Sequence, residues 1–106
     1  MTNFIEIKTT FSNCSKGQKS MNEIIKILLQ EKLSKCLQST KIESHYIWPQ
    51  DSEEINHEQE ILLTIKAKKK NYDKIAKIIS DNHQYDLPQI IYSDICGGDN
   101  KYLEWL

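Results

Sequence analysis

The order of the predicted elements indicates an α+β domain in which two helices cover one face of a four-stranded antiparallel sheet. Two stretches have the apolar spacing of amphipathic helices and four have the alternation of strands, in the order β-α-β-β-α-β. Because strand–helix–strand crossings are right-handed, both helices are expected on the same face of the sheet. A chain of 106 residues suffices for one hydrophobic core, so we expect a single domain over residues 1–106.

The first strand and the first helix are predicted from a change of periodicity close to residue 14. Residues 4–11 (FIEIKTTF) alternate and are rich in β-branched side chains, which is typical of a strand. Ser15 and Gln18 have the spacing of a capping box, so we expect the helix to start there. The apolar stripe of this helix comprises Met21, Ile24, Ile25, Leu28, Leu29 and Leu33.

The second and third strands are predicted on either side of a turn-rich, acidic connection at residues 49–56. Residues 36–48 alternate with period two, and one face of this strand is expected to hold Ile42, Ser44, Tyr46 and Trp48. Residues 58–67 alternate in the same way. The third strand therefore has Ile61, Leu63 and Ile65 on one face and Leu62 and Thr64 on the other.

The rest of the chain predicts a second helix, a fourth strand and a short terminal helix. Asn71 is the expected cap of the second helix. The buried stripe of that helix comprises Tyr72, Ile75, Ala76, Ile78 and Ile79. Residues 87–95 form the fourth strand, opened by Pro88 at a position where a missing N–H is tolerated. Two glycines then break the chain before the terminal helix at residues 100–106.

The third and fourth strands carry apolar residues on both faces. Leu62 lies between two core residues, and Ile90 is followed directly by Ile91. A sheet that is apolar on both sides buries both sides, and no further element of the chain is left to cover the second one. We therefore expect the protein to associate with copies of itself.

Composition excludes several classes of function. The net charge is −1 and all 14 basic residues are lysines, which argues against binding to nucleic acid. We expect neither a secretory leader nor a membrane span, because no apolar run is long enough for either. Three widely spaced cysteines (Cys14, Cys36 and Cys96) indicate reduced thiols in a cytoplasmic protein. No motif of nucleophilic or phosphate chemistry occurs, so we do not expect an enzyme.

Six short segments carry a resemblance to a known family. They are Thr9-Thr10-Phe11, residues 31–38 (EKLSKCLQ), Ser44-x-Tyr46-x-Trp48, residues 60–66 (EILLTIK), His83-x-Tyr85-x-x-Pro88-x-Ile90 and Tyr102-Leu103-x-Trp105. In this order they resemble motifs of the CutA family of divalent-cation tolerance proteins, over nearly the whole chain. The resemblance implies a ferredoxin-like fold and a homotrimer with its sheets inside and its helices outside. It also implies similarity to PII-like signalling trimers, in which clefts between subunits bind small effectors.

The resemblance also points to a metal. In some bacterial members of the CutA family, a cysteine near the end of the first strand and a double histidine before the tyrosine are associated with copper. Thr9 and Asn82 occupy what look like the corresponding positions here, which leaves His83 from that set. His83 is therefore our candidate ligand for copper or another divalent cation.

Two further readings of the titratable residues stay open. Cys14 and Cys96 lie in loops and are additional candidate ligands, because copper(I) prefers soft thiolates. His83 also lies at the end of a helix, where it caps carbonyl groups in the alternative interpretation. His45 and His57 are expected on the surface with no assigned role.

A second candidate site is a cleft lined by aromatic and charged side chains. Its members are Tyr46, Trp48, Glu60, Lys66, Tyr85, Tyr102 and Trp105. Aromatic walls with one acid and one base suit a cleft between subunits that binds a small effector or a partner segment. Alternatively, the aromatic side chains seal a trimer interface while Glu60 and Lys66 form an ion pair.

Overall fold

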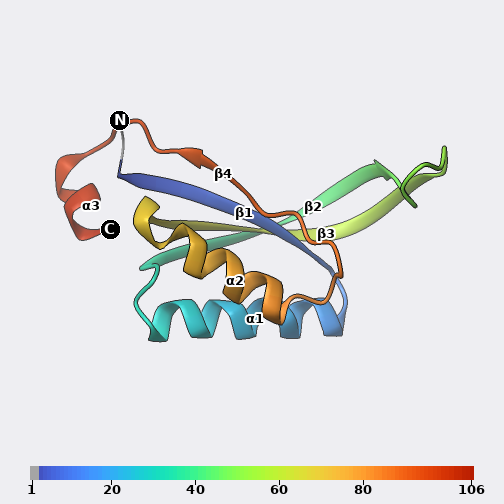
Figure 1. Cartoon of the computed structure of the whole chain (residues 1–106), viewed down its shortest axis with the longest axis horizontal. Helices are drawn as coiled ribbons and strands as arrows, with labels where there is room; N and C mark the ends of the chain where they lie inside the picture. Colours follow the sequence, from blue (N-terminus) through green and yellow to red (C-terminus); the bar gives the residue numbers. More distant parts are fainter. Residues whose placement is uncertain (1–2) are drawn as a thin grey trace.

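The computed structural model describes residues 3–106 and contains the predicted elements in the predicted order (Figure 1). The elements are β1 (Phe4–Ser12), α1 (Ser15–Gln30), β2 (Cys36–Ile47), β3 (Ile55–Lys68), a 3₁₀ turn η1 (Lys69–Asn71), α2 (Tyr72–Asn82), β4 (Ile91–Asp94) and α3 (Asn100–Trp105). None of the helices in this part of the chain combines the length and the apolar character needed to cross a membrane.

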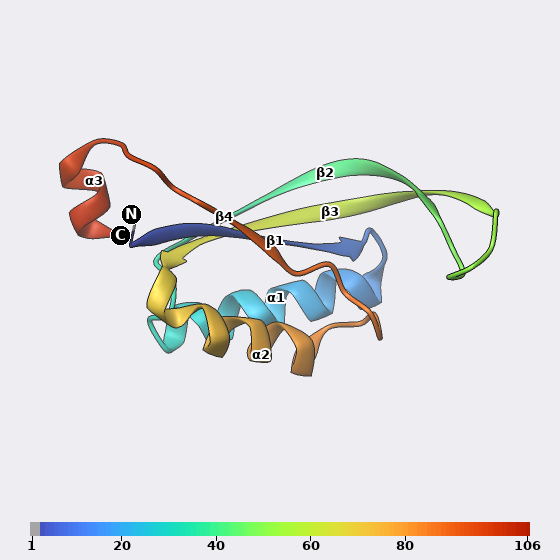
Figure 2. The same ribbon diagram turned by 45° about the horizontal axis from the view of Figure 1, so that its top comes forward.

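The four strands form one antiparallel sheet in the order β2-β3-β1-β4. Both α1 and α2 lie on the same side of this sheet, as Figure 2 shows. The expected α+β architecture, with two helices on one face and a short terminal helix, is therefore confirmed. The longest pairing joins β2 to β3, from Cys36 opposite Lys66 to Ile47 opposite Ile55.

The hydrophobic core fills the space between the sheet and the two helices. Alternate residues of β1 and β3 point towards the helices and are buried: Ile5, Ile7, Phe11, Ile61, Leu63, Ile65 and Ala67. The helices contribute Met21, Ile24, Leu28, Ile75 and Ile79. The period-two and helical patterns of the sequence thus identified these buried faces, except that Leu29, predicted in the apolar stripe of α1, is exposed.

Both ends of α1 differ from the prediction. The helix is capped by Cys14, whose Sγ accepts a hydrogen bond from the Gly17 N–H at 3.4 Å, so the expected capping box does not form. The Gln18 amide instead donates to Asn13. At the other end Lys32 adopts a left-handed conformation (φ 56°), which ends the helix before Leu33.

The fourth strand is shorter than predicted, covering Ile91–Asp94 rather than residues 87–95. It pairs with β1 only from Ile5 to Lys8. Farther along this edge of β1, the loop that follows α2 takes the place of a strand, since the Ser12 N–H donates to Gln84 Oε1 at 2.9 Å. Asn71 is the N-cap residue of α2, as predicted, but its side chain makes no capping hydrogen bond and its amide donates to the Leu33 carbonyl at 3.4 Å.

The sheet face away from the helices is only partly apolar. Leu62 pairs with Thr10 and Ile91 pairs with Lys8, so apolar and polar side chains are mixed on that face. Ile90, by contrast, packs against the core. The stronger sign of self-association lies elsewhere. Large apolar side chains are exposed at and beside the hairpin tip, namely Ile47, Trp48, Ile55 and Leu87.

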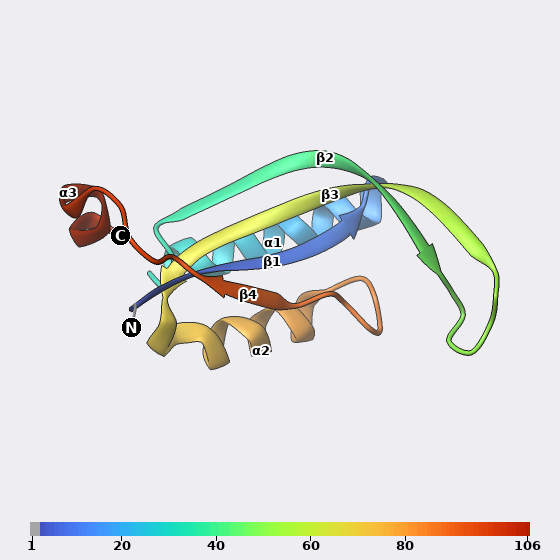
Figure 3. The same cartoon turned by 90° about the horizontal axis from the view of Figure 1, so that it is seen from above.

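The β2–β3 hairpin extends well past the ends of both helices, whereas α3 lies at the opposite end of the sheet (Figures 1 and 3). Beyond the helices the hairpin has no second layer within residues 3–106, so side chains that point to the helix side of the sheet emerge into solvent there. This extension separates the molecule into a packed body and a protruding two-stranded arm.

Two adjacent leucines of α1 test the position of the core. Leu28 is 0% exposed and Leu29 is 46% exposed. Leu28→Ala is expected to lower the free energy of unfolding by about 2–5 kcal/mol through loss of packing and creation of a cavity. The matched variant Leu29→Ala should lower the free energy of unfolding much less, because Leu29 is already partly in solvent. Urea denaturation of both variants measures the difference, and equal costs would contradict this placement of the helix.

Candidate functional site

His83 lies at the end of α2, where it is held from both sides of its ring. Its Nδ1 accepts a hydrogen bond from the Tyr85 N–H at 3.0 Å, so the neutral ring carries its proton on Nε2. That nitrogen lies 3.2 Å from Thr9 Oγ1 and donates to it. The ring also stacks on Phe11, with centroids 4.3 Å apart. Burial lowers the pKa of His83, which keeps the imidazole neutral.

These contacts bear on the metal hypothesis for His83. Thr9, at the position that looks like the cysteine of copper-associated relatives, does lie against the histidine as the resemblance implies. A hydroxyl, however, is a much poorer ligand for copper than a thiolate. Both ring nitrogens of His83 already have hydrogen-bond partners, so metal ligation by this residue requires at least one of the two bonds to break. His83 as a ligand stays a prediction.

The cysteines are dispersed in the fold. Cys14 is exposed and caps α1, and hydrogen bonds from Ser12 first and then from the Gly17 backbone lower the pKa of its thiol. Cys96 is exposed, and Cys36 is partly buried at the start of β2. Within residues 3–106, neither Cys14 nor Cys96 belongs to a group of three converging ligands. Their role as ligands also stays a prediction.

The loop after α2 builds one wall of a cleft on the other face of the sheet. The Tyr85 hydroxyl donates to Glu60 Oε2 at 2.8 Å, and Glu60 is only 7% exposed. The cleft has a volume of about 510 Å³ and is lined by Thr10, Tyr46, Trp48, Asn56, Glu58, Glu60, Tyr85, Asp86, Leu87 and Gln89. Burial raises the pKa of both Tyr46 and Tyr85, so the two phenols remain neutral beside the carboxylates.

The predicted cleft residues divide into two groups within one chain. Tyr46, Trp48, Glu60 and Tyr85 line this cleft. Lys66 lies at the other end of the sheet, with its Nζ 3.5 Å from the Tyr102 hydroxyl and 5.4 Å from the centre of that ring. Trp105 packs against Tyr102 there. Glu60 and Lys66 are six residues apart on one strand, about 20 Å, so they form no ion pair within the chain. A single site with all seven residues requires a second copy.

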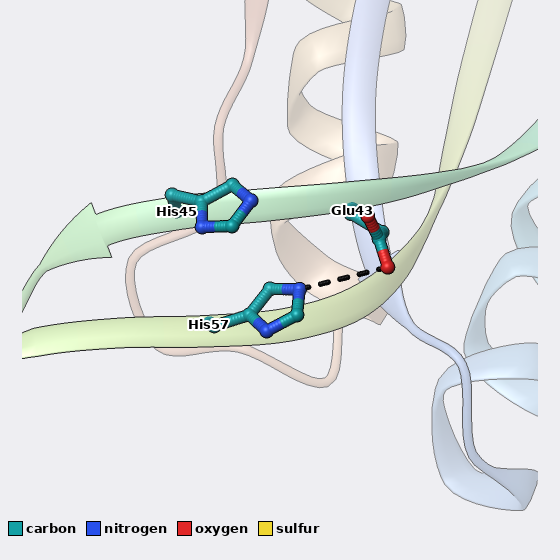
Figure 4. Close-up of side chains that lie close together, drawn as sticks. All are labelled: Glu43, His45 and His57. Carbon is teal, nitrogen blue, oxygen red and sulfur yellow. Dashed lines mark ion pairs between the residues drawn. The ribbon is translucent and has the colours of Figure 1, made fainter.

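One cluster of metal-ligating residue types was not anticipated from the sequence. Glu43, His45 and His57 lie together on the β2–β3 hairpin, as Figure 4 shows. The predicted 49–56 connection is centred between residues 52 and 53, which leaves His45 and His57 out of register. The observed pairing, with Ile47 opposite Ile55, centres the hairpin on Asp51 and sets the two histidines opposite each other.

The fold and these sites define a ferredoxin-like domain with a long hairpin arm and a cleft on its open sheet face. The chain matches the family model described as CutA1 divalent ion tolerance protein over residues 8–106, and it belongs to this family.

Known relatives agree with this assignment. The chain is 36% identical over 103 residues to the chloroplastic protein CutA of Arabidopsis thaliana, covering 96% of this chain and 53%, about half, of that relative. It is 28% identical over 102 residues to the divalent-cation tolerance protein CutA of Pyrococcus horikoshii, covering 96% of this chain and 93% of the relative. The crystal structure of CutA1 from Oryza sativa superposes with a TM-score of 0.84 at 32% identity, covering 97% of this chain and 89% of that one.

Acid should destabilise the protein through His83. Because burial lowers the pKa of His83 in the folded state, the unfolded chain takes up the proton first as the pH falls through about 6.5. The contribution of the neutral ring is complete above that pH and declines below it. We expect the urea midpoint to fall between pH 7.5 and 5, with a smaller fall in His83→Gln. An equal fall in the variant would assign the pH effect to other groups.

Proposed function

We propose that the protein binds a divalent metal ion, copper in particular, and contributes to divalent-ion tolerance without catalysing a reaction. The observation that carries this proposal is membership of the CutA1 divalent ion tolerance family over residues 8–106. The relative from Pyrococcus horikoshii bears the name divalent-cation tolerance protein. The chain also offers imidazole, carboxylate and thiol groups on accessible surfaces, which suit copper and zinc better than magnesium.

The binding part of this proposal has a direct test. Equilibrium dialysis of the full chain against Cu²⁺ or Zn²⁺ is expected to show saturable binding of one ion per chain. Mg²⁺ serves as the control ion, because it prefers an octahedron of oxygen ligands and should not bind comparably. Absence of saturable binding for both Cu²⁺ and Zn²⁺ would refute the metal-binding function.

We further propose that the protein acts as a homotrimer in the cytoplasm. Support for association comes from the exposed apolar side chains at and beside the hairpin tip and from the outer edge of β2. This strand is 12 residues long and its outer edge pairs with no other strand of residues 3–106. Such an edge offers a row of backbone donors and acceptors to another strand. Contact between copies would also provide the second chain that the divided cleft residues require.

Light scattering tests the assembly. At micromolar concentration we expect three times the mass of one chain. Ile55 is 79% exposed at the hairpin tip. A charge there should weaken an apolar interface, so Ile55→Lys is expected to shift the equilibrium towards smaller species. The matched variant Asp51→Lys changes a charge in the same connection without removing apolar surface. A monomeric wild-type protein would contradict the proposed trimer.

A second candidate function is regulatory binding of a small effector in the cleft, in the manner of PII-like trimers. The observation that favours it is the composition of the cleft, in which three carboxylates (Glu58, Glu60 and Asp86) accompany three aromatic rings and no basic residue. Carboxylates next to aromatic faces attract organic cations by charge and by cation–π interaction. An amine or a basic partner segment therefore fits this cleft better than an anion.

Intrinsic fluorescence tests the effector hypothesis, because Trp48 lies in the cleft. Titration with a panel of organic amines is expected to change the Trp48 emission, with weaker binding in Glu60→Gln. Trp105 lies outside the cleft, so the response should persist in Trp105→Phe and vanish in Trp48→Phe. A response that persists in Trp48→Phe, or no response to any amine, would count against an effector site here.

A further inference from the structure

We infer that Glu43, His45 and His57 form a binding site for a divalent transition-metal ion, Zn²⁺ or Cu²⁺, on the protruding part of the β2–β3 hairpin. This inference rests on the proposed metal-binding function and deepens it by assigning the ion to residues other than His83. The three residues are the group of histidine, cysteine and acidic side chains within residues 3–106 whose ligand atoms converge.

The strand register brings the three side chains together. His45 on β2 pairs directly with His57 on β3, and their rings stack with centroids 4.4 Å apart and planes within 2°. Glu43 precedes His45 by two residues and therefore points to the same face. Its Oε1 lies 3.7 Å from His57 Nε2. Figure 4 shows the carboxylate beside the two rings on the same side of the hairpin.

The cluster is close to the dimensions of a metal site. One ligand atom from each residue lies within 4.8 Å of the others. Ligands bound to zinc at 2.0–2.1 Å in a tetrahedron are about 3.3 Å from one another, so the side chains must close by about 1.5 Å or less. To bring the ligand atoms closer together, the two rings have to rotate out of their stacked arrangement. Rotation of these exposed side chains permits this.

The site is accessible and its backbone is held on both sides. The side chains of His57 and Glu43 are 52% and 64% exposed, because the hairpin extends past the helices at this point. Pairing between β2 and β3 continues on either side of the cluster, from Ile42 opposite Glu60 to Tyr46 opposite Asn56. Ligands borne on paired strands are better positioned than ligands on a free loop.

The chemistry of the three ligands selects the class of ion. Two imidazoles with one carboxylate suit Zn²⁺ and Cu²⁺, whereas Mg²⁺ and Ca²⁺ prefer oxygen ligands alone. Three protein ligands leave a coordination position open in a four-coordinate site. Such a site can accept and release an ion through water exchange.

The positive charge of a neighbouring lysine opposes the binding of a cation at this site. Lys41 lies two residues before Glu43 on the same face of β2 and lines a shallow hollow with it, together with Asn13 and Gln59. Its ammonium group and a metal compete for the same carboxylate. By contrast with His83, however, neither ring of the hairpin pair is engaged by a backbone donor at this site in the described part of the chain.

The test compares two sets of histidines in the full chain. Binding of Zn²⁺ and Cu²⁺ is measured for the wild type, His45→Gln/His57→Gln, Glu43→Gln and His83→Gln, with Cys14→Ser/Cys96→Ser as the thiol control. We expect the double-histidine variant to bind at least about tenfold more weakly, and Glu43→Gln to be weakened, with His83→Gln and the thiol control unchanged. Circular dichroism confirms that each variant is folded.

The outcomes separate this inference from the proposed function. Metal binding that is lost only in His83→Gln or in the thiol control overturns the hairpin site and leaves the metal-binding function standing. Binding that no variant changes also overturns the hairpin site. A wild-type protein that binds neither ion refutes the metal-binding function itself and this site with it. Electron paramagnetic resonance of the Cu²⁺ complex gives a second readout, with hyperfine coupling to two nitrogens expected from His45 and His57.

Discussion

The antiparallel register between β1 and β3 is the constraint on which the rest of the structure depends. It places Ile7 beside Ile65 and Phe11 beside Ile61 on the helix side, where both helices pack. The same register sets Glu60 opposite Ser12 on the other face. A shift by one residue would turn the core side chains of the shifted strand to the opposite face, so the burial of this face enforces the pairing. The position of each candidate site follows from it.

The loop after α2 packs against the strands that this register aligns, and together they form the cleft. Its first residue, His83, packs on Phe11 and Thr9 on the helix side, while Tyr85 reaches Glu60 on the open side. The loop thus joins the two faces at one edge of β1, beyond the end of the pairing between β1 and β4. A neutral histidine and a phenol held next to a carboxylate fix the shape of the cleft wall, which favours a structural role for His83 as the chain is folded here.

The hairpin provides a different kind of surface, because no helix of the described chain covers its protruding part (Figure 3). Its tip exposes apolar side chains suited to contact with another copy, and its middle carries two histidines and a glutamate suited to a metal ion. The proposed assembly and the proposed ion binding therefore both involve the same two strands. The acidic, aromatic cleft lies on the opposite face of the sheet, so that a cation in the cleft and an ion on the hairpin occupy separate places.

The sequence by itself determined the architecture, the buried faces of the strands and most of the apolar stripe of each helix, because periodicity reports which side of an element is covered. The six motifs also indicated the family. Only the tertiary structure decided which side chains meet. Glu60 contacts Tyr85 and not Lys66, β4 stops at four residues, and His45 faces His57. These outcomes depend on strand register and on the path of a loop. Both are set by contacts between residues far apart in the chain, which local periodicity does not encode.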